Sequence, residues 1–434
     1  MLDNSPNVLS QEFNDVISLL EYSSDHYFIT GKAGTGKSTL LQIFRNTTKK
    51  RVVILAPTGI AALNVKGQTI HSFFGFPPRM MDSTEIVRRK NHKFFQNIDM
   101  IIIDEISMVR ADMIDNINIF LQINRGVIKP FGGVQMVFFG DMFQLPPVVS
   151  TPFERQYFRE NYSSQYFFSS KVIENDFPLK MIELNQVFRQ DEKLFIKLLD
   201  NIRLNCFDED DLMMINERYL PLPENMEFFV TLTGKNATAD AINQAEILKL
   251  DEYKKIYSAT IKGEFNPQLY PADPNLLLKR NAQVMFVKND PQKQFVNGTI
   301  GKITHIGEDE IMATILDDDG SERQIKVEEQ EWEIVKYSKN VTEPDKIETE
   351  VIGTFRQYPI KLAWAITIHK SQGKTFERVI IDMAGGAFEF GQTYVALSRC
   401  KRLDGIFLKS MIKPRDIIVD QKVCEYYDSM KRWG

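Results

Sequence analysis

The sequence of 434 residues contains few cysteines, and no stretch of it is long and apolar enough to span a bilayer. Its three cysteines, Cys206, Cys400 and Cys424, lie far apart, which argues against a disulfide framework or a cysteine-based metal site. The N-terminus lacks the basic and apolar segments of a secretory signal. We therefore expect a protein that stays inside the cell, in the cytoplasm or on the nucleoid if it is bacterial, without contact to a membrane.

The chain also lacks the net positive charge that is common in nucleic-acid-binding proteins, since its formal net charge is −5. The acidity is concentrated in residues 303–350, where fifteen acidic and five basic residues give a net charge of −10. The rest of the chain is therefore mildly basic. Because a local groove can be basic on an acidic protein, the net charge neither requires nor excludes a polyanionic partner.

Short apolar runs rich in β-branched residues recur along the chain and predict two sets of buried parallel strands. Their hydrophobicity is continuous rather than alternating, which indicates that both faces of each sheet are covered. Helical patterns separate the runs, so we expect βαβ units in an α/β fold with two large domains. The first set comprises residues 26–30, 52–56, 100–104 and 135–140, and the second comprises residues 227–233, 360–367, 378–382 and 405–408.

A stretch with a different pattern interrupts the second set of strands. Between residues 281 and 336 the sequence indicates short strands and tight turns, and Asn297-Gly298 and Asp319-Gly320 are strong hairpin signals. We predict a small β-barrel inserted into the second α/β domain, followed by a polar linker at residues 338–350. The expected domains are residues 1–180, residues 181–280 together with 351–434, and the insertion at residues 281–350.

The strongest single motif is the segment GKAGTGKS at residues 31–38, which has the form GxxxxGK[ST]. It follows a predicted strand and precedes an apolar helical start, the context in which such a loop cradles phosphates with backbone N–H groups. We expect Lys37 to reach the terminal phosphates of a nucleotide and Ser38 to ligate Mg²⁺. The predicted nucleotide-binding residues are Gly34, Thr35, Gly36, Lys37, Ser38 and Thr39. A glycine-rich turn without a ligand is the alternative, which the flanking strand and helix disfavour.

Two further strand ends carry polar residues suited to the same site. The run IIIDE places Asp104 and Glu105 at the C-terminal edge of a strand, where ligands bind in open α/β sheets. We expect Asp104 to hold the Mg²⁺ shell and Glu105 to activate the attacking water as general base. In the segment GDMFQLPP, Gln144 is expected to sense the γ-phosphate, although the two prolines could simply stiffen a loop.

Two arginines could complete the site from elsewhere in the chain. Arg189 lies in the segment LNQVFRQ, and Arg399 lies in the segment TYVALSR. An arginine beside the transferring phosphoryl group stabilises its charge and accelerates the reaction by about 10³-fold or more. Arginines also form ordinary surface salt bridges, so neither segment is decisive by itself.

Several strand-end loops with hydroxyl and basic side chains predict a track for a single nucleic-acid strand, which is held by phosphate contacts and base stacking. Residues 64–80 mix polar groups with aromatics, and we predict a DNA-facing hairpin there that acts as a wedge. A local hydrophobic plug is the alternative for this segment, and a structural role is the alternative for His369. The predicted contacts are Pro57, Thr58, Gly59, Asn64, His71 and Phe73 in the first domain, and Thr233, Lys235, Asn236, Thr367, His369 and Lys370 in the second.

Together, these motifs resemble those of superfamily-one helicases in their order along the chain. After the phosphate loop come APTGIAALNVKGQTIHSFFGFP, IIIDEISM, AITIHKSQGKTFERVIID and TYVALSRCK. The segments PFGGVQMVFFGDMFQLPPV and LNQVFRQ resemble the Pif (petite integration frequency) helicase family in particular, and the RecD family less closely. The similarity covers about residues 9–401.

The resemblance implies two RecA-like P-loop NTPase domains with a barrel of Src-homology-three type inserted in the second. It implies ATP and Mg²⁺ as ligands, and a monomeric DNA helicase that moves 5′ to 3′ on single-stranded DNA. Forked duplexes, G-quadruplexes and RNA–DNA hybrids are the implied substrates, with roles in DNA repair, recombination and telomere maintenance. By the same resemblance Gln11 would read adenine, Gln372 would link the second domain to the nucleotide, and Arg189 and Arg399 would be arginine fingers.

Other functions fit the sequence less well. A non-motor P-loop ATPase would not need the separate segments HKSQG and ALSR, and a binding module with a vestigial nucleotide site would not need the intact Lys37, Ser38, Asp104 and Glu105. The sequence has no NKxD guanine motif, which disfavours a GTPase, and no spare carboxylate cluster for a nuclease. A strand-stimulated translocase that remodels nucleoprotein without unwinding duplex is the remaining alternative.

Overall fold

The first domain is built on a six-stranded parallel sheet with the strand order β3-β2-β4-β5-β1-β6. The computed structural model describes residues 10–190, 192–308, 310–317, 320–339, 347–383 and 385–432. The strands are β1 (His26–Gly31), β2 (Val52–Ala56), β3 (Gln68–Thr69), β4 (Met100–Ile103), β5 (Gln135–Phe139) and β6 (Leu179–Leu184). All four strands predicted from continuous apolar runs are present, and every residue of β4 and β5 is buried, as expected when helices cover both faces.

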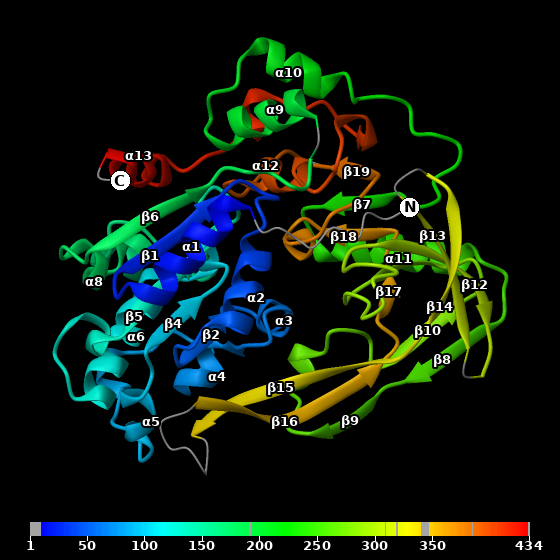
Figure 1. The fold of residues 1–434 in the computed structure, drawn as a ribbon. Helices are drawn as coiled ribbons and strands as arrows, with labels where there is room; N and C mark the ends of the chain where they lie inside the picture. The colour runs from blue at the N-terminus through cyan, green and yellow to red at the C-terminus, as the bar shows by residue number, and fades with distance from the viewer. Residues whose placement is uncertain are drawn as a thin grey trace.

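Eight α-helices of the described chain surround this sheet and create a core on each side of it (Figure 1). Successive residues of β4 point to opposite faces, so Ile101 and Ile103 enter one cluster while Met100 and Ile102 enter the other. The helices are α1 (Gln11–Tyr22), α2 (Lys37–Thr47), α3 (Gly59–Asn64), α4 (Ile70–Phe74), α5 (His92–Gln96), α6 (Ala111–Arg125), α7 (Pro152–Asn161) and α8 (Lys171–Glu174). None of the helices in the described ranges is long and apolar enough to cross a bilayer.

Two segments extend the first domain beyond the boundary expected at residue 180. β6 pairs with β1 as far as Leu184, because its hydrogen bonds complete the edge of the sheet. The C-terminal helix α13 (Gln421–Arg432) was expected in the second domain, but Val423 and Tyr427 are buried in the first-domain core. Figure 1 shows α13 lying beside β6. The expected start of the second domain at residue 181 is therefore wrong. The assignment of all of residues 351–434 to that domain is also wrong.

The second domain contains a four-stranded parallel sheet with the order β18-β7-β19-β20. The strands are β7 (Val230–Thr233), β18 (Ala365–Thr367), β19 (Val379–Asp382) and β20 (Ile406–Leu408), and the helices are α9 (Lys193–Arg203), α10 (Glu209–Asn216), α11 (Asn236–Lys249) and α12 (Gln392–Leu397). The strand expected at residues 360–367 is divided between two sheets. Its first part is a separate strand, and Gln283 Nε2 donates to Ala363 O (2.9 Å) where the chain passes from one sheet to the other.

The inserted sheet is antiparallel, with the order β14-β13-β12-β11-β17. Its strands are β11 (Gln283–Phe286), β12 (Ile300–Ile306), β13 (Ile311–Leu316), β14 (Glu322–Val327) and β17 (Ile360–Leu362), and the pair β8 (Lys254–Ser258) and β10 (Asn275–Lys279) packs against it. Tyr257, Leu276 and Leu278 share the core of this sheet, so the unit begins before the boundary expected at residue 281. In the predicted hairpin signal Asn297-Gly298, Gly298 has a positive φ of 107°. In the signal Asp319-Gly320, Asp319 lies outside the described residues.

A three-stranded antiparallel arm reaches from the second domain to the first, and the sequence analysis did not predict it. The arm consists of β15 (Gln330–Lys339), β16 (Ile347–Gln357) and β9 (Thr260–Gly263), and Figure 1 shows it running from the inserted sheet toward α4. Tyr337 Oη accepts a hydrogen bond from Ile54 N (3.0 Å) of the first sheet. The linker expected at residues 338–350 is therefore wrong at its described ends, which are strands, while residues 340–346 lie outside the described ranges.

Candidate functional site

The phosphate loop lies between β1 and α2 and closes around its own lysine. Gly34 and Gly36 adopt φ angles of 87° and 77°, a region that glycine enters without steric cost. α2 begins at Lys37, whose Nζ donates to the carbonyl oxygens of Gly31 (2.7 Å) and Lys32 (3.0 Å). Burial lowers the pKa of Lys37 to about 8. The ammonium group thus points into the loop, where a terminal phosphate would replace the two carbonyl groups as its partner.

Asp104 and Glu105 follow β4 at the carboxyl edge of the first sheet. Asp104 is 6% exposed, and burial together with the neighbouring Glu105 carboxylate raises its pKa. Glu105 adopts φ 49° and ψ 46°, a left-handed conformation that is uncommon for a residue with a Cβ atom. Burial raises the pKa of Glu105, whereas the charges of Lys37 and Arg399 lower it. Both carboxylates therefore lie in a poorly solvated site, within electrostatic range of cations from both domains.

Arg189 and Arg399 approach this site from different segments. Nη1 of Arg189 donates to Ser398 O (3.2 Å), and Nε of Arg399 donates to Val395 O (2.9 Å). Burial, followed by the charge of Arg399, lowers the pKa of Arg189 to about 9, and burial lowers the pKa of Arg399 to about 10. The half-buried Arg189 and the buried Arg399 repel one another near the Glu105 carboxylate, and they form a cationic site that a phosphate anion would neutralise.

Gln144 and Gln372, which the sequence analysis assigned to nucleotide sensing, meet across the domain interface. Gln144 lies in the loop after β5, and Gln372 follows the 3₁₀ helix η6 (His369–Ser371). Nε2 of Gln372 donates to Oε1 of Gln144 (3.4 Å), and Nε2 of Gln144 donates to Oδ2 of Asp141 (3.4 Å). These long hydrogen bonds connect a loop of the second domain to the end of β5, the strand next to β4, which carries Asp104 and Glu105 at its end. Their sensing role stays a prediction.

The first turn of α1 lies against the phosphate loop. Gln11 is exposed there, and its Nε2 donates to Oδ1 of Asp15 (2.7 Å). Phe13 makes an edge-to-face contact with Phe188, with ring centroids 5.7 Å apart. A Cβ atom on Gly36 would lie 2.8 Å from Cζ of Phe13, so this aromatic pair covers the loop directly. The pair was not expected from the sequence, because its two residues belong to no phosphate-binding motif.

Three buried polar residues that were not among the predicted site residues join the phosphate loop to the second domain. Tyr394 Oη accepts a hydrogen bond from Ala33 N (2.8 Å) and donates to Oδ2 of Asp141 (3.1 Å). Oδ1 of Asp141 accepts from Nε of Arg203 (3.1 Å). Asp141 and Tyr394 lie within the motifs GDMFQLPP and TYVALSR and could have been noticed there. Arg203 on α9 has no such signal, because only the packing of α9 brings it to Asp141.

In the first domain, the loop predicted to contact nucleic acid packs against the second domain. Thr58 caps α3, with its Oγ1 accepting a hydrogen bond from Ala61 N (3.2 Å). A Cβ atom on Gly59 would lie 2.3 Å from Cδ2 of Leu269 in the 3₁₀ helix η5 (Pro267–Leu269), so the loop and this leucine are in close contact. Of the other predicted contacts nearby, Asn64 is exposed, and Pro57 and His71 are half-buried.

In the second domain, the two threonines predicted to bind phosphate are buried and engaged within their own loops. Oγ1 of Thr233 donates to Lys235 O (3.0 Å), and Oγ1 of Thr367 accepts from Lys370 N (3.3 Å). Both hydroxyl groups therefore order the loops from inside. The remaining candidates are Lys235, Asn236 and Lys370, which are exposed, and His369, which is half-buried.

Comparison with known proteins assigns these features to one family. Residues 8–211 match the PIF1-like helicase family. The ATP-dependent DNA helicase Pif1 of Bdellovibrio bacteriovorus is 32% identical over 431 residues, which cover 96% of this chain and 91% of that protein. The chain belongs to the Pif1-like helicase family.

Two solved Pif1 structures from Bacteroides resemble this Pif1-like chain over nearly its full length. The complex with ADP-AlF4 is 34% identical and has a TM-score of 0.88, covering 99% of this chain and 98% of that chain. The complex with single-stranded DNA is 36% identical and has a TM-score of 0.69 with the same coverage. This Pif1-like helicase therefore superposes more closely on the first complex than on the second.

Two lysines missed by the sequence analysis lie near Lys370 in this Pif1-like helicase. Nζ of Lys374 donates to Oδ1 of Asn297 (2.7 Å) at the junction with the inserted sheet. Burial, followed by the charge of Lys370, lowers the pKa of Lys361 to about 8. Burial, followed by the charge of Lys361, lowers the pKa of Lys374 to about 7. A group of poorly solvated cations that repel one another favours the binding of an anion.

The hairpin predicted at residues 64–80 is not formed, while the contact of this segment with DNA stays a prediction. This segment forms the end of α3, the short strand β3 and the helix α4. Phe74 and Phe76 are buried in the first-domain core, and Phe73 packs edge-to-face against Phe95 (5.7 Å) and Tyr337 (5.9 Å). Burial of these rings against α5, α6 and the arm stabilises a helix here, so the hydrophobic plug is the structure that forms.

We expect Phe73→Ala to reduce stability rather than DNA binding. Because the ring is partly exposed, the free energy of unfolding should fall by about 2 kcal/mol, less than the ~3–5 kcal/mol of a fully buried phenylalanine. Urea denaturation measures this change, with Phe153→Ala as the control because Phe153 is 70% exposed on α7. If Phe73→Ala had normal stability but bound single-stranded DNA more weakly, Phe73 would instead contact DNA directly.

Proposed function

We propose that the protein is a motor that moves 5′ to 3′ along single-stranded DNA and unwinds forked duplex DNA. As a Pif1-like helicase it is an ATP-dependent DNA helicase that hydrolyses ATP. The observation that carries the proposal is the convergence of Lys37 and Glu105 from the first domain with Arg189, which lies beside the phosphate loop, and Arg399 from the second domain. Such an arrangement links ATP turnover to the separation of the two domains.

Within this site we assign each residue a role in phosphoryl transfer. Lys37 binds the terminal phosphates, Glu105 accepts a proton from the attacking water, and Arg189 and Arg399 stabilise the charge on the transferring group. Gln11 reads the adenine edge, since an amide can donate and accept at once, and Gln144 and Gln372 report the γ-phosphate to both domains. The backbone of Gly34, Thr35 and Gly36 and the first helical residues Ser38 and Thr39 complete the nucleotide site.

The donors present fit a magnesium ion bound together with the nucleotide. Ser38 is exposed at the first turn of α2, and the Asp104 carboxylate is buried nearby at the end of β4 with a raised pKa. A cation beside Asp104 would favour its ionised form. The described residues hold no group of three or more His, Cys, Asp and Glu side chains suited to a metal, so nucleotide oxygens and water would supply the other ligands. When bound, Mg²⁺ neutralises charge on the β- and γ-phosphates.

ATP binding draws the two domains together, because the γ-phosphate supplies the anion that Arg189 and Arg399 require. Hydrolysis removes this anion, and repulsion between Arg189 and Arg399 then favours separation. Each domain grips the strand through its own loops, so alternate closing and opening moves the protein along DNA. The proposed grips are Pro57, Thr58, Gly59, Asn64 and His71 in the first domain, and Thr233, Lys235, Asn236, Thr367, His369 and Lys370 in the second.

Lys361 and Lys374 add to the proposed grip of the second domain. Both lie near the exposed Lys370, and the mutual repulsion of these ammonium groups is relieved when a DNA phosphate binds between them.

The finer parts of the proposal rest on the family resemblance. We assign G-quadruplexes and RNA–DNA hybrids as further substrates, a Src-homology-three type to the inserted sheet, a monomeric state, and roles in DNA repair, recombination and telomere maintenance. The alternative function is a single-strand-stimulated translocase that remodels nucleoprotein without unwinding duplex.

Strand separation tests the proposal directly. A fluorescent forked duplex with either a 5′ or a 3′ single-stranded tail is incubated with the protein, with and without ATP and Mg²⁺. We expect unwinding of the 5′-tailed substrate alone and only with ATP. Unwinding of the 3′-tailed substrate alone would overturn the polarity, and strand-stimulated ATPase without unwinding would favour the alternative function. Glu105→Gln serves as the turnover-deficient control in the same assay.

A further inference from the structure

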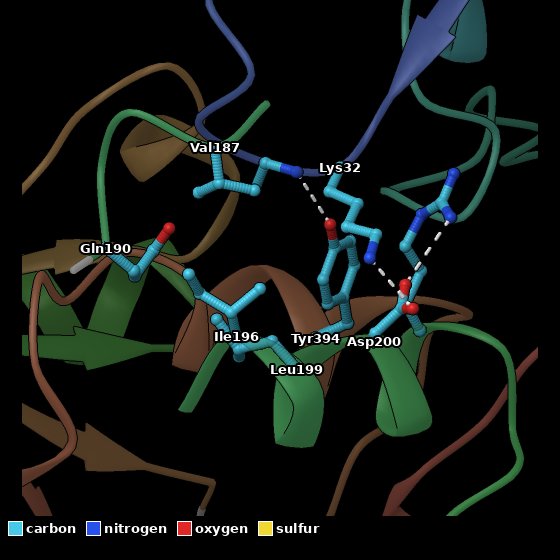
Figure 2. Close-up of a pocket in the computed structure, with 9 residues that line it drawn as sticks. Lys32, Val187, Gln190, Ile196, Leu199, Asp200 and Tyr394 are labelled. Atoms are coloured by element: carbon cyan, nitrogen blue, oxygen red, sulfur yellow. Dashed lines mark hydrogen bonds and ion pairs between the residues drawn. The ribbon is translucent and has the colours of Figure 1, made fainter. Parts of the chain in front are cut away.

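Tyr394 on α12 is a direct contact between the second domain and the phosphate loop. Its side chain is 3% exposed, and its Oη accepts a hydrogen bond from Ala33 N (2.8 Å) in the loop. The same hydroxyl group donates to Oδ2 of Asp141 (3.1 Å) at the end of β5. Figure 2 shows the phenol ring pointing at the loop beside Lys32, which itself pairs with Asp200 of α9 (2.9 Å).

The acceptor of the Tyr394 proton is held in a fixed orientation. Oδ1 of Asp141 accepts a hydrogen bond from Nε of Arg203 (3.1 Å), and the Arg203 guanidinium lies over the Phe143 ring at 4.5 Å. Phe143 N also donates to Oδ1 of Asp141 (3.3 Å). Burial and the adjacent Asp141 carboxylate raise the pKa of Tyr394, so its hydroxyl group stays protonated and remains a donor.

The element that carries Tyr394 also holds Arg399. Nε of Arg399 donates to Val395 O (2.9 Å), and Nη2 donates to Oγ of Ser398 (2.7 Å). These bonds tie the guanidinium group to the backbone and end of α12, so it cannot move independently of that helix. The distance of Arg399 from the phosphate loop therefore depends on how α12 is seated on the first domain.

We propose that Tyr394 is a positioning residue for Arg399: its hydroxyl group, bonded to Ala33 N–H and Asp141, seats α12 on the phosphate loop and thereby places Arg399 at the γ-phosphate. This inference rests on the proposed function, because it needs Arg399 to act on a nucleotide. Domain separation breaks both hydrogen bonds of Tyr394 at once. The hydrogen bonds of Tyr394 and the placement of Arg399 at the γ-phosphate therefore form together and are lost together during each ATP cycle.

Tyr394→Phe removes only the hydroxyl group and tests the proposal. We expect kcat of the DNA-stimulated ATPase to fall by about 10–100-fold, the range for two buried hydrogen bonds, because Arg399 acts in the transition state. KM for ATP should change by less than about threefold, since Arg399 interacts far more strongly with the transition state than with bound ATP. Tyr426→Phe is the matched control, because the Tyr426 hydroxyl is buried without a hydrogen-bond partner among the described residues and its ring stacks on Phe168 (4.2 Å).

A double variant shows whether Tyr394 acts through Arg399. In an Arg399→Ala background, Tyr394→Phe should cause no further loss of kcat. A full additional loss in that background, or an unchanged kcat in the single variant, would overturn the proposal. A tenfold rise in KM with unchanged kcat would do the same, because it would make Tyr394 a determinant of ATP affinity.

Hydrogen exchange of the phosphate-loop peptide gives a second readout that needs no enzymatic activity. Amide exchange at residues 32–36 should be faster in Tyr394→Phe than in the wild-type protein, and unchanged in Tyr426→Phe. If the wild-type protein showed no DNA-stimulated ATPase, the proposed function would fail. Unchanged amide exchange in Tyr394→Phe would separately contradict the proposal that the Tyr394 hydroxyl group holds α12 on the phosphate loop.

Discussion

Glu105→Gln is expected to lower the kcat of DNA-stimulated ATP hydrolysis by about 10²–10⁴-fold, the usual contribution of a general base. Glutamine has the same shape as glutamate but cannot take the proton from the attacking water. Glu105 is suited to this role because burial raises its pKa, while the nearby charges of Lys37 and Arg399 partly oppose that rise.

Binding and turnover must be measured separately for Glu105→Gln. ATP affinity, followed with a fluorescent nucleotide, should stay within a few-fold of wild type, because Lys37 and the loop glycines are intact. Glu160→Gln is the matched control, since Glu160 lies on the exposed face of α7 and its only described contact is with Gln156 (2.9 Å). Near-normal turnover in Glu105→Gln would exclude Glu105 as the base.

Arg189→Ala and Arg399→Ala are each expected to reduce kcat by about 10³-fold or more, the size of effect attributed to arginine fingers. Both side chains donate hydrogen bonds to the second-domain backbone and lie within electrostatic range of Glu105. Their conservative replacements by lysine should recover little activity, because lysine keeps the charge but not the planar pair of donors. Single-turnover hydrolysis with saturating DNA measures the loss.

Arg402→Ala is the control for both arginine fingers. Arg402 follows Arg399 by three positions, but its side chain is 60% exposed and pairs with Glu192 (3.2 Å) and Asp404 (3.1 Å). Its removal should leave kcat within about twofold, because exposed ion pairs contribute little. If Arg189→Ala or Arg399→Ala lowered only thermal stability and left kcat unchanged, that arginine would be a structural residue of the domain interface.

The features that could be predicted from the sequence are those encoded in contiguous segments. Continuous apolar runs predicted β1, β2, β4 and β5, because a buried parallel strand needs apolar side chains on both faces. The phosphate loop was recognisable because its glycine spacing and following lysine are required by local backbone geometry. The acids after β4 could be placed for the same reason, since they follow the strand directly.

The features that could not be predicted depend on contacts between distant segments. Phe73 was expected at a DNA-facing hairpin because its neighbours are aromatic and polar, but its partners Phe95 and Tyr337 are not adjacent in sequence. The hydrogen bond from Ala33 to Tyr394 spans 361 positions, and no local pattern reveals it. The expected boundary at residue 180 failed because β6 gains its hydrogen bonds from β1.

By itself, the sequence determined the two parallel sheets, the phosphate loop, the acids beside it and the family to which the chain belongs. Only the tertiary structure decided that α13 returns to the first domain, that the arm reaches Ile54 through Tyr337, and that Tyr394 contacts the phosphate loop. The physical reason is that strand burial and phosphate-loop geometry are fixed within a few residues. Docking instead depends on apolar surface and hydrogen bonds summed over segments that meet only in the folded chain.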